Sequence, residues 1–270
     1  MKNKKEETAM EAGTIEVNGV TMAYNTAGQG SPILFIHGNT GSKTWFEKVM
    51  EIKGLRTVAP DMPNFGESDH IESADIDLYA DYIREFISAM GLPTPLPVVG
   101  HSLGGAVAIS LAIRNPHLVS RLMLVDSAPM NGLKTPEEHY PVIEMYKNNY
   151  DLLYQALQAV TPTMDDPGFL ERLAQQAMNM NPIAFAGNAR ALERFDYTGK
   201  GAEFDGPVLV VLGDKDVLIT PEMAKATADA FPKSSLKVLH GVGHSVMVET
   251  PDTFTALVKE FFSGSKDVGS

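Results

Sequence analysis

Three residue types that can form a nucleophilic site follow apolar runs in this chain: a serine, several acids and a histidine. Ser102 stands between Gly100 and Gly104 in the segment Gly-His-Ser-Leu-Gly. Serine alone is a poor nucleophile at neutral pH. It needs a base that takes its proton and an acid that holds the base in the correct tautomer. The positions of histidines and acids relative to this serine therefore decide whether the chemistry is possible.

The segments around Ser102 predict a sharp turn from a strand into a helix. Residues 96–99 form an apolar run typical of a buried strand, and apolar residues at helical spacing continue from Ser102 to about residue 115. Such a turn strains the backbone at the serine, so Gly100 and Gly104 are expected where a side chain would collide. The start of the helix would direct backbone N–H groups and a positive dipole end towards an anion formed at the serine.

An acid and a histidine are expected at the same edge of the fold. The apolar run 207–212 leads into an acidic loop, and the run 236–240 leads into a glycine turn that carries His244. In a parallel sheet, the loops at the carboxyl ends of the strands build the site. The reasoning from strand ends leaves three candidates for the acid, namely Asp214, Asp216 and Asp126, the last of which follows an earlier apolar run.

The rest of the chain alternates between apolar runs and helical patterns. A hairpin with an Asn-Gly turn is predicted for residues 14–25. Further strands are predicted at 33–36, 55–60 and 121–126, and helices at about 43–51, 75–90, 221–231 and 251–262. This alternation predicts an α/β fold with a doubly wound, mostly parallel central sheet.

One segment interrupts the alternation. Between about residues 127 and 205 there are helical patches, at 142–160 and 169–178, but no convincing strand. We interpret this segment as a helical cap inserted into the core. The expected organisation is a flexible lead at 1–12, the first core part at 13–127, the cap insertion at 128–205, the second core part at 206–262 and a flexible tail at 263–270.

Taken together, these motifs resemble the α/β-hydrolase family, in particular its cap-bearing esterases, lipases and C–C hydrolases. The resemblance extends over residues 14–262. It rests on His37-Gly38, the loop 61–68, the turn 100–105, the acidic loop 213–216 and Gly243-His244, which occur in the family's order. The loop 61–68 departs from many relatives by having Asn64 in place of glycine, and asparagine also tolerates a left-handed backbone.

The resemblance implies a role for each site residue. Ser102 corresponds to the nucleophile, His244 to the base and Asp216 to the acid. The oxyanion hole would be formed by the backbone N–H groups of Asn39 and Leu103, and His37 and Gly38 would be structural members of the turn beside it. A nearby pair of histidines, His240 and His244, does not suggest a metal site, because Gly241 and Gly243 break the helix that such a pair needs.

A serine at the nucleophile position favours hydrolysis of a small, apolar carboxylic ester through an acyl-enzyme. By the same resemblance, the alternative reactions are those of a C–C bond hydrolase, a lactonase or a cofactor-free perhydrolase. An alternative of a different class is a small-molecule sensor that retains the three residues. No motif in the chain indicates a cofactor, and the expected partner is a small-molecule substrate.

Composition narrows the remaining possibilities. The formal net charge of −12 disfavours binding to nucleic acid, since phosphate groups would be repelled. No apolar run approaches the length of a membrane span and no hydrophobic signal core follows the charged first residues, so a cytoplasmic location is expected. The absence of cysteine excludes disulfides, thiolate metal sites and a cysteine nucleophile. The sequence carries no indication of the oligomeric state.

Overall fold

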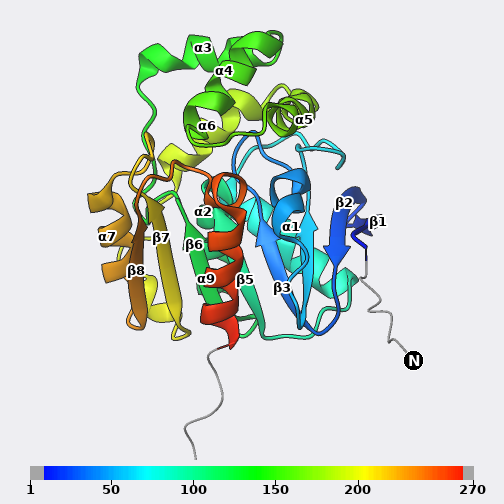
Figure 1. Cartoon of the computed structure of the whole chain (residues 1–270), viewed down its shortest axis with the longest axis vertical. Helices are drawn as coiled ribbons and strands as arrows, with labels where there is room; N and C mark the ends of the chain where they lie inside the picture. Colours follow the sequence, from blue (N-terminus) through cyan, green and yellow to red (C-terminus); the bar gives the residue numbers. More distant parts are fainter. Residues whose placement is uncertain (1–8, 264–270) are drawn as a thin grey trace, which may run out of the picture.

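An eight-stranded sheet runs through the core of the computed structural model, which describes residues 9–263 (Figure 1). The strand order is β1-β2-β4-β3-β5-β6-β7-β8. β1 and β2 are antiparallel to their neighbours, and all other pairs are parallel. The strands are β1 (Glu11–Val17), β2 (Val20–Ala27), β3 (Ser31–Ile36), β4 (Leu55–Pro60), β5 (Leu96–His101), β6 (Val119–Val125), β7 (Val208–Gly213) and β8 (Ser234–Leu239). The predicted α/β class with a mostly parallel sheet is confirmed.

The two ends of the sequence differ from the prediction where the structure describes them. β1 begins at Glu11, inside the predicted flexible lead, because its backbone pairs with β2 from Glu11 opposite Thr26 onward and this pairing does not require apolar side chains. At the other end, α9 (Pro251–Ser263) continues to Ser263, the first residue of the predicted tail. The remainder of both predicted segments, residues 1–8 and 264–270, lies outside the described residues.

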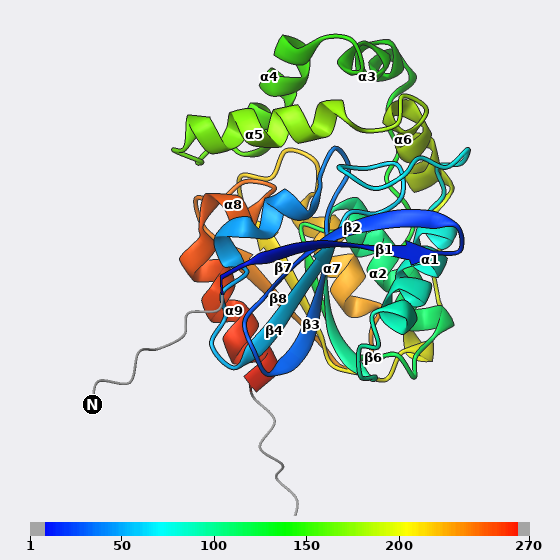
Figure 2. The ribbon, with the colours of Figure 1, turned by 90° about the vertical axis from the view of Figure 1, so that its right-hand side faces the viewer.

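Helices cover both faces of the sheet, which explains why its central strands are continuous apolar runs. In Figure 2 the strands lie between α9 on one side and the pair α1 (Ile76–Ala89) and α2 (Leu103–Arg114) on the other. The last four residues of β3 are fully buried as a result. The remaining core helices are η1 (Lys43–Val49), α7 (Pro221–Asp229) and α8 (Val246–Glu249). Within the described residues, no helix has the length and apolar character needed to cross a membrane.

Four α-helices and two short 3-10 helices, η2 (Glu137–His139) and η3 (Gly201–Glu203), lie between β6 and β7 in the segment 128–205, called the cap segment below. The α-helices are α3 (Tyr140–Tyr146), α4 (Tyr150–Val160), α5 (Pro167–Met178) and α6 (Ala184–Arg194), and all four lie beyond the carboxyl ends of the parallel strands (Figures 1 and 2). The single helix predicted for 142–160 is divided, because Asn149 has an extended backbone and its side chain accepts the Leu152 N–H as an N-cap.

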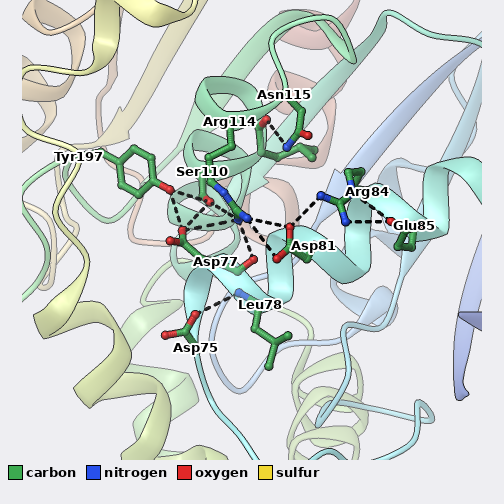
Figure 3. A network of polar contacts seen from close by, with 11 residues as sticks. Asp75, Asp77, Leu78, Asp81, Arg84, Glu85, Ser110, Arg114, Asn115 and Tyr197 are labelled. Atoms are coloured by element: carbon green, nitrogen blue, oxygen red, sulfur yellow. Dashed lines mark hydrogen bonds and ion pairs between the residues drawn. The ribbon is translucent and has the colours of Figure 1, made fainter. Parts of the chain in front are cut away.

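The end of the cap segment is fastened to the core by a cluster of polar side chains (Figure 3). The Tyr197 hydroxyl donates to Asp77 Oδ1 over 2.7 Å, and the buried Ser110 hydroxyl donates to the same oxygen over 2.6 Å. Arg114 contacts both oxygens of Asp81 at 2.9 and 3.1 Å. Because Asp77 and Asp81 lie on α1 and Ser110 and Arg114 on α2, the return of the chain from the cap segment is fixed against both helices.

Candidate active site

Ser102 occupies a strained turn between β5 and α2. Its backbone has φ 54° and ψ −119°, a conformation rarely adopted by a residue with a side chain. A Cβ atom on Gly100 would lie 2.4 Å from the Gly104 carbonyl oxygen, and one on Gly104 would lie 2.3 Å from the His37 carbonyl oxygen. The two glycines therefore permit the close backbone approach that holds Ser102 at the carboxyl edge of the sheet.

The structure brings Ser102, His244 and Asp216 into one hydrogen-bonded line. His244 Nε2 lies 2.9 Å from Ser102 Oγ, and His244 Nδ1 lies 2.7 Å from Asp216 Oδ2. The side chains of His244 and Asp216 are 5% and 0% exposed, so water screens their interaction little. An Nδ1–H that donates to the carboxylate leaves Nε2 as the acceptor for the serine proton.

Asp216 is held by backbone donors as well as by the imidazole. Its Oδ1 atom accepts the N–H of Leu218 over 2.7 Å and the N–H of Ile219 over 3.1 Å. These bonds occupy the oxygen that does not face His244. The loop after β7 thus presents one carboxylate oxygen, in a fixed position, to the histidine.

The two other candidate acids have different partners. Asp214 Oδ2 lies 3.0 Å from Nδ1 of the exposed His240, and its Oδ1 atom accepts the Gly241 N–H over 2.7 Å. Asp126 follows β6 and is buried, with Oδ1 accepting the Gly213 N–H over 2.9 Å. Burial and then the nearby Asp216 charge raise the pKa of Asp126 well above its usual value. Neither acid is hydrogen-bonded to His244 among the described residues.

The loop after β3, residues 37–42 and called the β3 loop below, lies directly beside the serine. A Cβ atom on Gly38 would come within 2.8 Å of Ser102 Cβ. His37 is fully buried and uses both ring nitrogens, since Nδ1–H donates to the Gly38 carbonyl at 2.9 Å and Nε2 accepts the Met62 N–H at 3.1 Å. Burial lowers the pKa of His37, so the ring is neutral and ties the β3 loop to the loop after β4.

Two backbone N–H groups at this position have no competing partner. The Asn39 N–H donates to no hydrogen bond among the described residues, and Leu103 is the first residue of α2, where an N–H has no intrahelical acceptor. Leu103 follows Ser102 directly, and Asn39 follows Gly38, whose Cβ atom would lie within 2.8 Å of Ser102 Cβ. The two N–H groups can donate hydrogen bonds to an oxygen that acquires negative charge next to Ser102 Oγ.

A buried ion pair supports the β3 loop, and the sequence reasoning did not assign it. Asp61 accepts the backbone N–H of Lys43 over 2.6 Å and its ammonium group over 2.9 Å, and Lys43 Nζ also reaches Glu67 at 2.7 Å. Burial opposes the charge on Lys43, but the carboxylates of Asp61 and Glu67 outweigh it and raise the pKa of Lys43. In the sequence, the acidic loop 61–68 was the only indication of this ion pair, and it did not identify Lys43 as the partner.

His101, which precedes the serine, is a second residue that the sequence reasoning left without a role. Its ring is buried, lies beside Trp45 with centroids 5.8 Å apart, and donates from Nε2 to the His244 carbonyl oxygen over 2.8 Å. Burial, and then proximity to His244, lower the pKa of His101 to about 3, so the ring is neutral. It therefore holds the backbone of His244 without adding charge. Across the described part of the chain, no group of three or more histidine and acidic side chains is gathered as a metal site would require.

The fold and this site define the class of the protein. The family model of the alpha/beta hydrolase fold matches residues 31–251, which is most of the chain. The protein therefore belongs to the α/β-hydrolase family, and its relatives support hydrolase activity.

Among known proteins, the chain is similar to Lipase 3 of Moraxella sp. (strain TA144), with 28% identity over 265 residues that cover 92% of this chain and 83% of the relative. It is also similar to 2-hydroxy-6-oxo-6-(2'-aminophenyl)hexa-2,4-dienoic acid hydrolase of Metapseudomonas resinovorans, with 25% identity over 98% of this chain and 96% of the relative. A solved thermophilic esterase superimposes with a TM-score of 0.79 and 26% identity, covering 94% of this chain and 98% of the esterase.

Proposed function

We propose that this protein is a serine hydrolase that cleaves small, apolar carboxylic esters through an acyl-enzyme intermediate. The observation that carries the proposal is the unbroken line of contacts from Ser102 Oγ to His244 Nε2, at 2.9 Å, and from His244 Nδ1 to Asp216 Oδ2, at 2.7 Å. Each contact has the length needed for proton transfer or orientation.

In the first half-reaction, Ser102 Oγ attacks the ester carbonyl carbon while His244 Nε2 accepts the hydroxyl proton. The imidazolium that forms donates from Nδ1 to the Asp216 carboxylate, which stabilises the new positive charge. His244 then returns the proton to the alcohol oxygen, so that the alcohol leaves and the acyl group remains on the serine.

The carbonyl oxygen becomes negatively charged when the tetrahedral intermediate forms. We assign its stabilisation to the backbone N–H groups of Asn39 and Leu103, which have no other acceptor among the described residues. Removing one such donor from a serine hydrolase typically costs roughly 10² to 10³ in kcat. In the second half-reaction, a water molecule gives a proton to His244 and attacks the acyl carbon. His244 then returns this proton to Ser102 Oγ as the bond to the serine breaks and the carboxylic acid leaves, which restores the free serine.

The relatives support an ester as the substrate. They include a lipase and an esterase, each covering most of this chain. The principal alternative is hydrolysis of a carbon–carbon bond, since a relative named as a hydrolase of a dienoic acid also matches along nearly its whole length. Both reactions would use the same three side chains, so substrate screening has to distinguish them.

Turnover of p-nitrophenyl acetate and butyrate tests the proposal, with lactones and a vinylogous diketone supplied in parallel. Continuous release of p-nitrophenolate is expected, together with covalent labelling of Ser102 by phenylmethylsulfonyl fluoride, located by peptide mass spectrometry. A single slow round of release would instead indicate a sensor that retains the three residues. Labelling at a residue other than Ser102 would contradict the assignment of the nucleophile.

A further inference from the structure

A buried chain of side-chain hydrogen bonds connects the cap segment to the residue that supplies one of the proposed oxyanion donors. Asn188 lies on α6 and is fully buried. Its Nδ2 atom donates to Asn39 Oδ1 over 2.8 Å, although the two residues are 149 positions apart. The contact joins the cap segment directly to the β3 loop.

The amide of Asn188 is itself held from the other side. The Tyr79 hydroxyl, on α1, donates to Asn188 Oδ1 over 2.9 Å and accepts from Asn64 Nδ2 over 3.3 Å. Burial raises the pKa of the Tyr79 hydroxyl, so it keeps the proton that it donates. Asn64 lies in the loop after β4 with φ 78°, the left-handed conformation expected from the sequence. In this series of hydrogen bonds, each residue from Asn64 onward therefore donates to the next, and Asn39 is the final acceptor.

The same contact fixes the orientation of the Asn39 side chain. Asn39 Oδ1 accepts from Asn188 Nδ2 and also from the backbone N–H of Thr40, at 3.0 Å. Thr40 has φ 54°, and its hydroxyl donates back to the Asn39 carbonyl oxygen over 2.6 Å. The Asn39–Thr40 peptide is thus held by side-chain bonds on both sides in a conformation that residues with a Cβ seldom adopt. Without Asn188, one of the bonds that hold this strained segment is lost.

We propose that Asn188 is a positioning residue, through which helix α6 of the cap segment holds the β3 loop in the geometry that stabilises the oxyanion. The inference rests on the proposed function, because it requires the Asn39 N–H to act on a developing charge. It goes further, since it makes transition-state stabilisation depend on the cap segment. A neutral amide in a buried position suits this task, because it donates to Asn39 and accepts from Tyr79 without introducing a buried charge.

The test compares Asn188→Ala with Asn181→Ala, a matched control. Asn181 precedes α6 and also fastens it to the core, since its side chain donates to Asn64 Oδ1 at 2.8 Å and to the Ile71 carbonyl at 3.0 Å. It does not contact Asn39 in the described hydrogen bonds. In Asn181→Ala the Asn64 side chain is still oriented, because it also accepts the Ile71 N–H at 2.8 Å and donates to the Ser73 carbonyl at 2.7 Å. The control therefore weakens cap attachment while leaving the contacts of Asn188 in place.

We expect Asn188→Ala to lower kcat for p-nitrophenyl butyrate by roughly 10- to 100-fold, less than complete loss of an oxyanion donor, with KM changed less than about threefold. Binding of a boronic acid transition-state analogue should weaken in parallel with kcat. Tyr79→Phe keeps the ring but removes the hydroxyl that orients Asn188, so it should lower kcat in the same direction by about threefold to tenfold. Asn181→Ala should keep the wild-type kcat.

Several results would overturn the inference. If Asn188→Ala and Tyr79→Phe keep the wild-type kcat, or if they raise KM alone, Asn188 only attaches the cap segment. Should Asn188→Ala fail to fold, the Tyr79→Phe result decides alone. The absence of ester turnover and of Ser102 labelling in the wild-type protein would overturn the proposed function itself, and this inference with it, whereas an active wild type with an unaffected Asn188→Ala variant overturns the inference alone.

Discussion

Replacing the acid of the site by its amide distinguishes the three aspartates that the sequence left open. In the Asp216→Asn variant the side chain keeps its size but loses its charge. Two consequences follow from its contacts. The imidazolium formed at His244 during attack is no longer stabilised by a carboxylate at 2.7 Å. In addition, the amide has a donor group where the carboxylate had a second acceptor, so its orientation matters.

The contacts of Asp216 predict that orientation. Its Oδ1 atom accepts two backbone N–H groups, from Leu218 and Ile219, so the amide oxygen of an asparagine will occupy this position. The amide NH₂ group then faces His244 Nδ1, which must give up its own proton to accept from it. The proton moves to Nε2, the atom that has to accept from Ser102. We expect kcat/KM to fall by roughly 10⁴-fold, or about 5 kcal/mol, as in other triads with this change.

The assay is hydrolysis of p-nitrophenyl butyrate at about pH 8, with Asp214→Asn and Asp126→Asn as matched controls. Asp214 makes a similar pair of bonds, to a histidine and to a backbone N–H, but His240 is exposed. Asp126 is buried with a raised pKa, so a neutral amide reproduces its protonated form and its acceptor for Gly213 N–H. Both controls should stay within about threefold of wild type. The reasoning is refuted if Asp126→Asn is the inactive variant and Asp216→Asn is not.

Three further predictions concern the turn, the nucleophile and the buried histidine. Ser102→Ala should lower kcat by roughly 10⁶-fold in the p-nitrophenyl assay while the melting temperature stays close to that of wild type, and more than a tenth of the activity remaining would exclude the serine mechanism. Gly104→Val should lower the free energy of unfolding by about 3 kcal/mol in thermal melts, because its Cβ would lie 2.4 Å from the Ile36 carbonyl oxygen; a variant as stable as wild type would contradict the geometry of the turn. Burial lowers the pKa of His101 from 6.5 to about 3, so only the unfolded chain takes up this proton as the pH falls between these values, and the folded state loses stability towards acid. His101→Gln should remove that share, about 1.4 kcal/mol per pH unit, from the pH dependence of urea unfolding, and an unchanged slope would show that His101 does not contribute.

The sequence predicted the core of the fold well because each core strand can be recognised from the pattern of its own residues. The predicted strands 33–36 and 55–60 lie within β3 and β4, since strands buried on both faces need no partner-specific pattern. β8 begins at Ser234, two residues before its apolar run, because its backbone pairs with β7 from Val208 onward. Strand ends are decided by such pairing, which involves residues far away in the sequence.

The cap segment was harder to predict than the core. Its helix α6 was not identified, because only Phe185 and Leu192 among its eleven residues are large and apolar. The small residues permit close packing, with Ala184, Ala189 and Ala191 buried, but this burial depends on the core surface beneath. The same reason explains why Asn188 could not be found, since a lone asparagine on a helix has no sequence signal that distinguishes it from a surface residue.

The two aspartate–histidine pairs show most directly what determines the site. Asp214 pairs with His240 and Asp216 with His244, with nearly the same sequence separation and bond lengths of 3.0 and 2.7 Å. The residue types do not distinguish the two pairs, but burial does. The histidine and aspartate side chains are 89% and 32% exposed in the first pair, and 5% and 0% exposed in the second.

Part of that burial comes from the cap segment. The His244 N–H donates to the carbonyl of Val160, the last residue of α4, over 3.2 Å, and a Cβ atom on Gly243 would lie 2.3 Å from the Pro162 ring. The cap segment therefore contacts the turn that carries His244 and helps to shield one of the two pairs from water. Because electrostatic interactions strengthen where water is excluded, the shielded carboxylate can stabilise an imidazolium, whereas the exposed one is screened. A change that detaches Val160 from the histidine turn is thus expected to weaken the buried pair without altering either of its side chains.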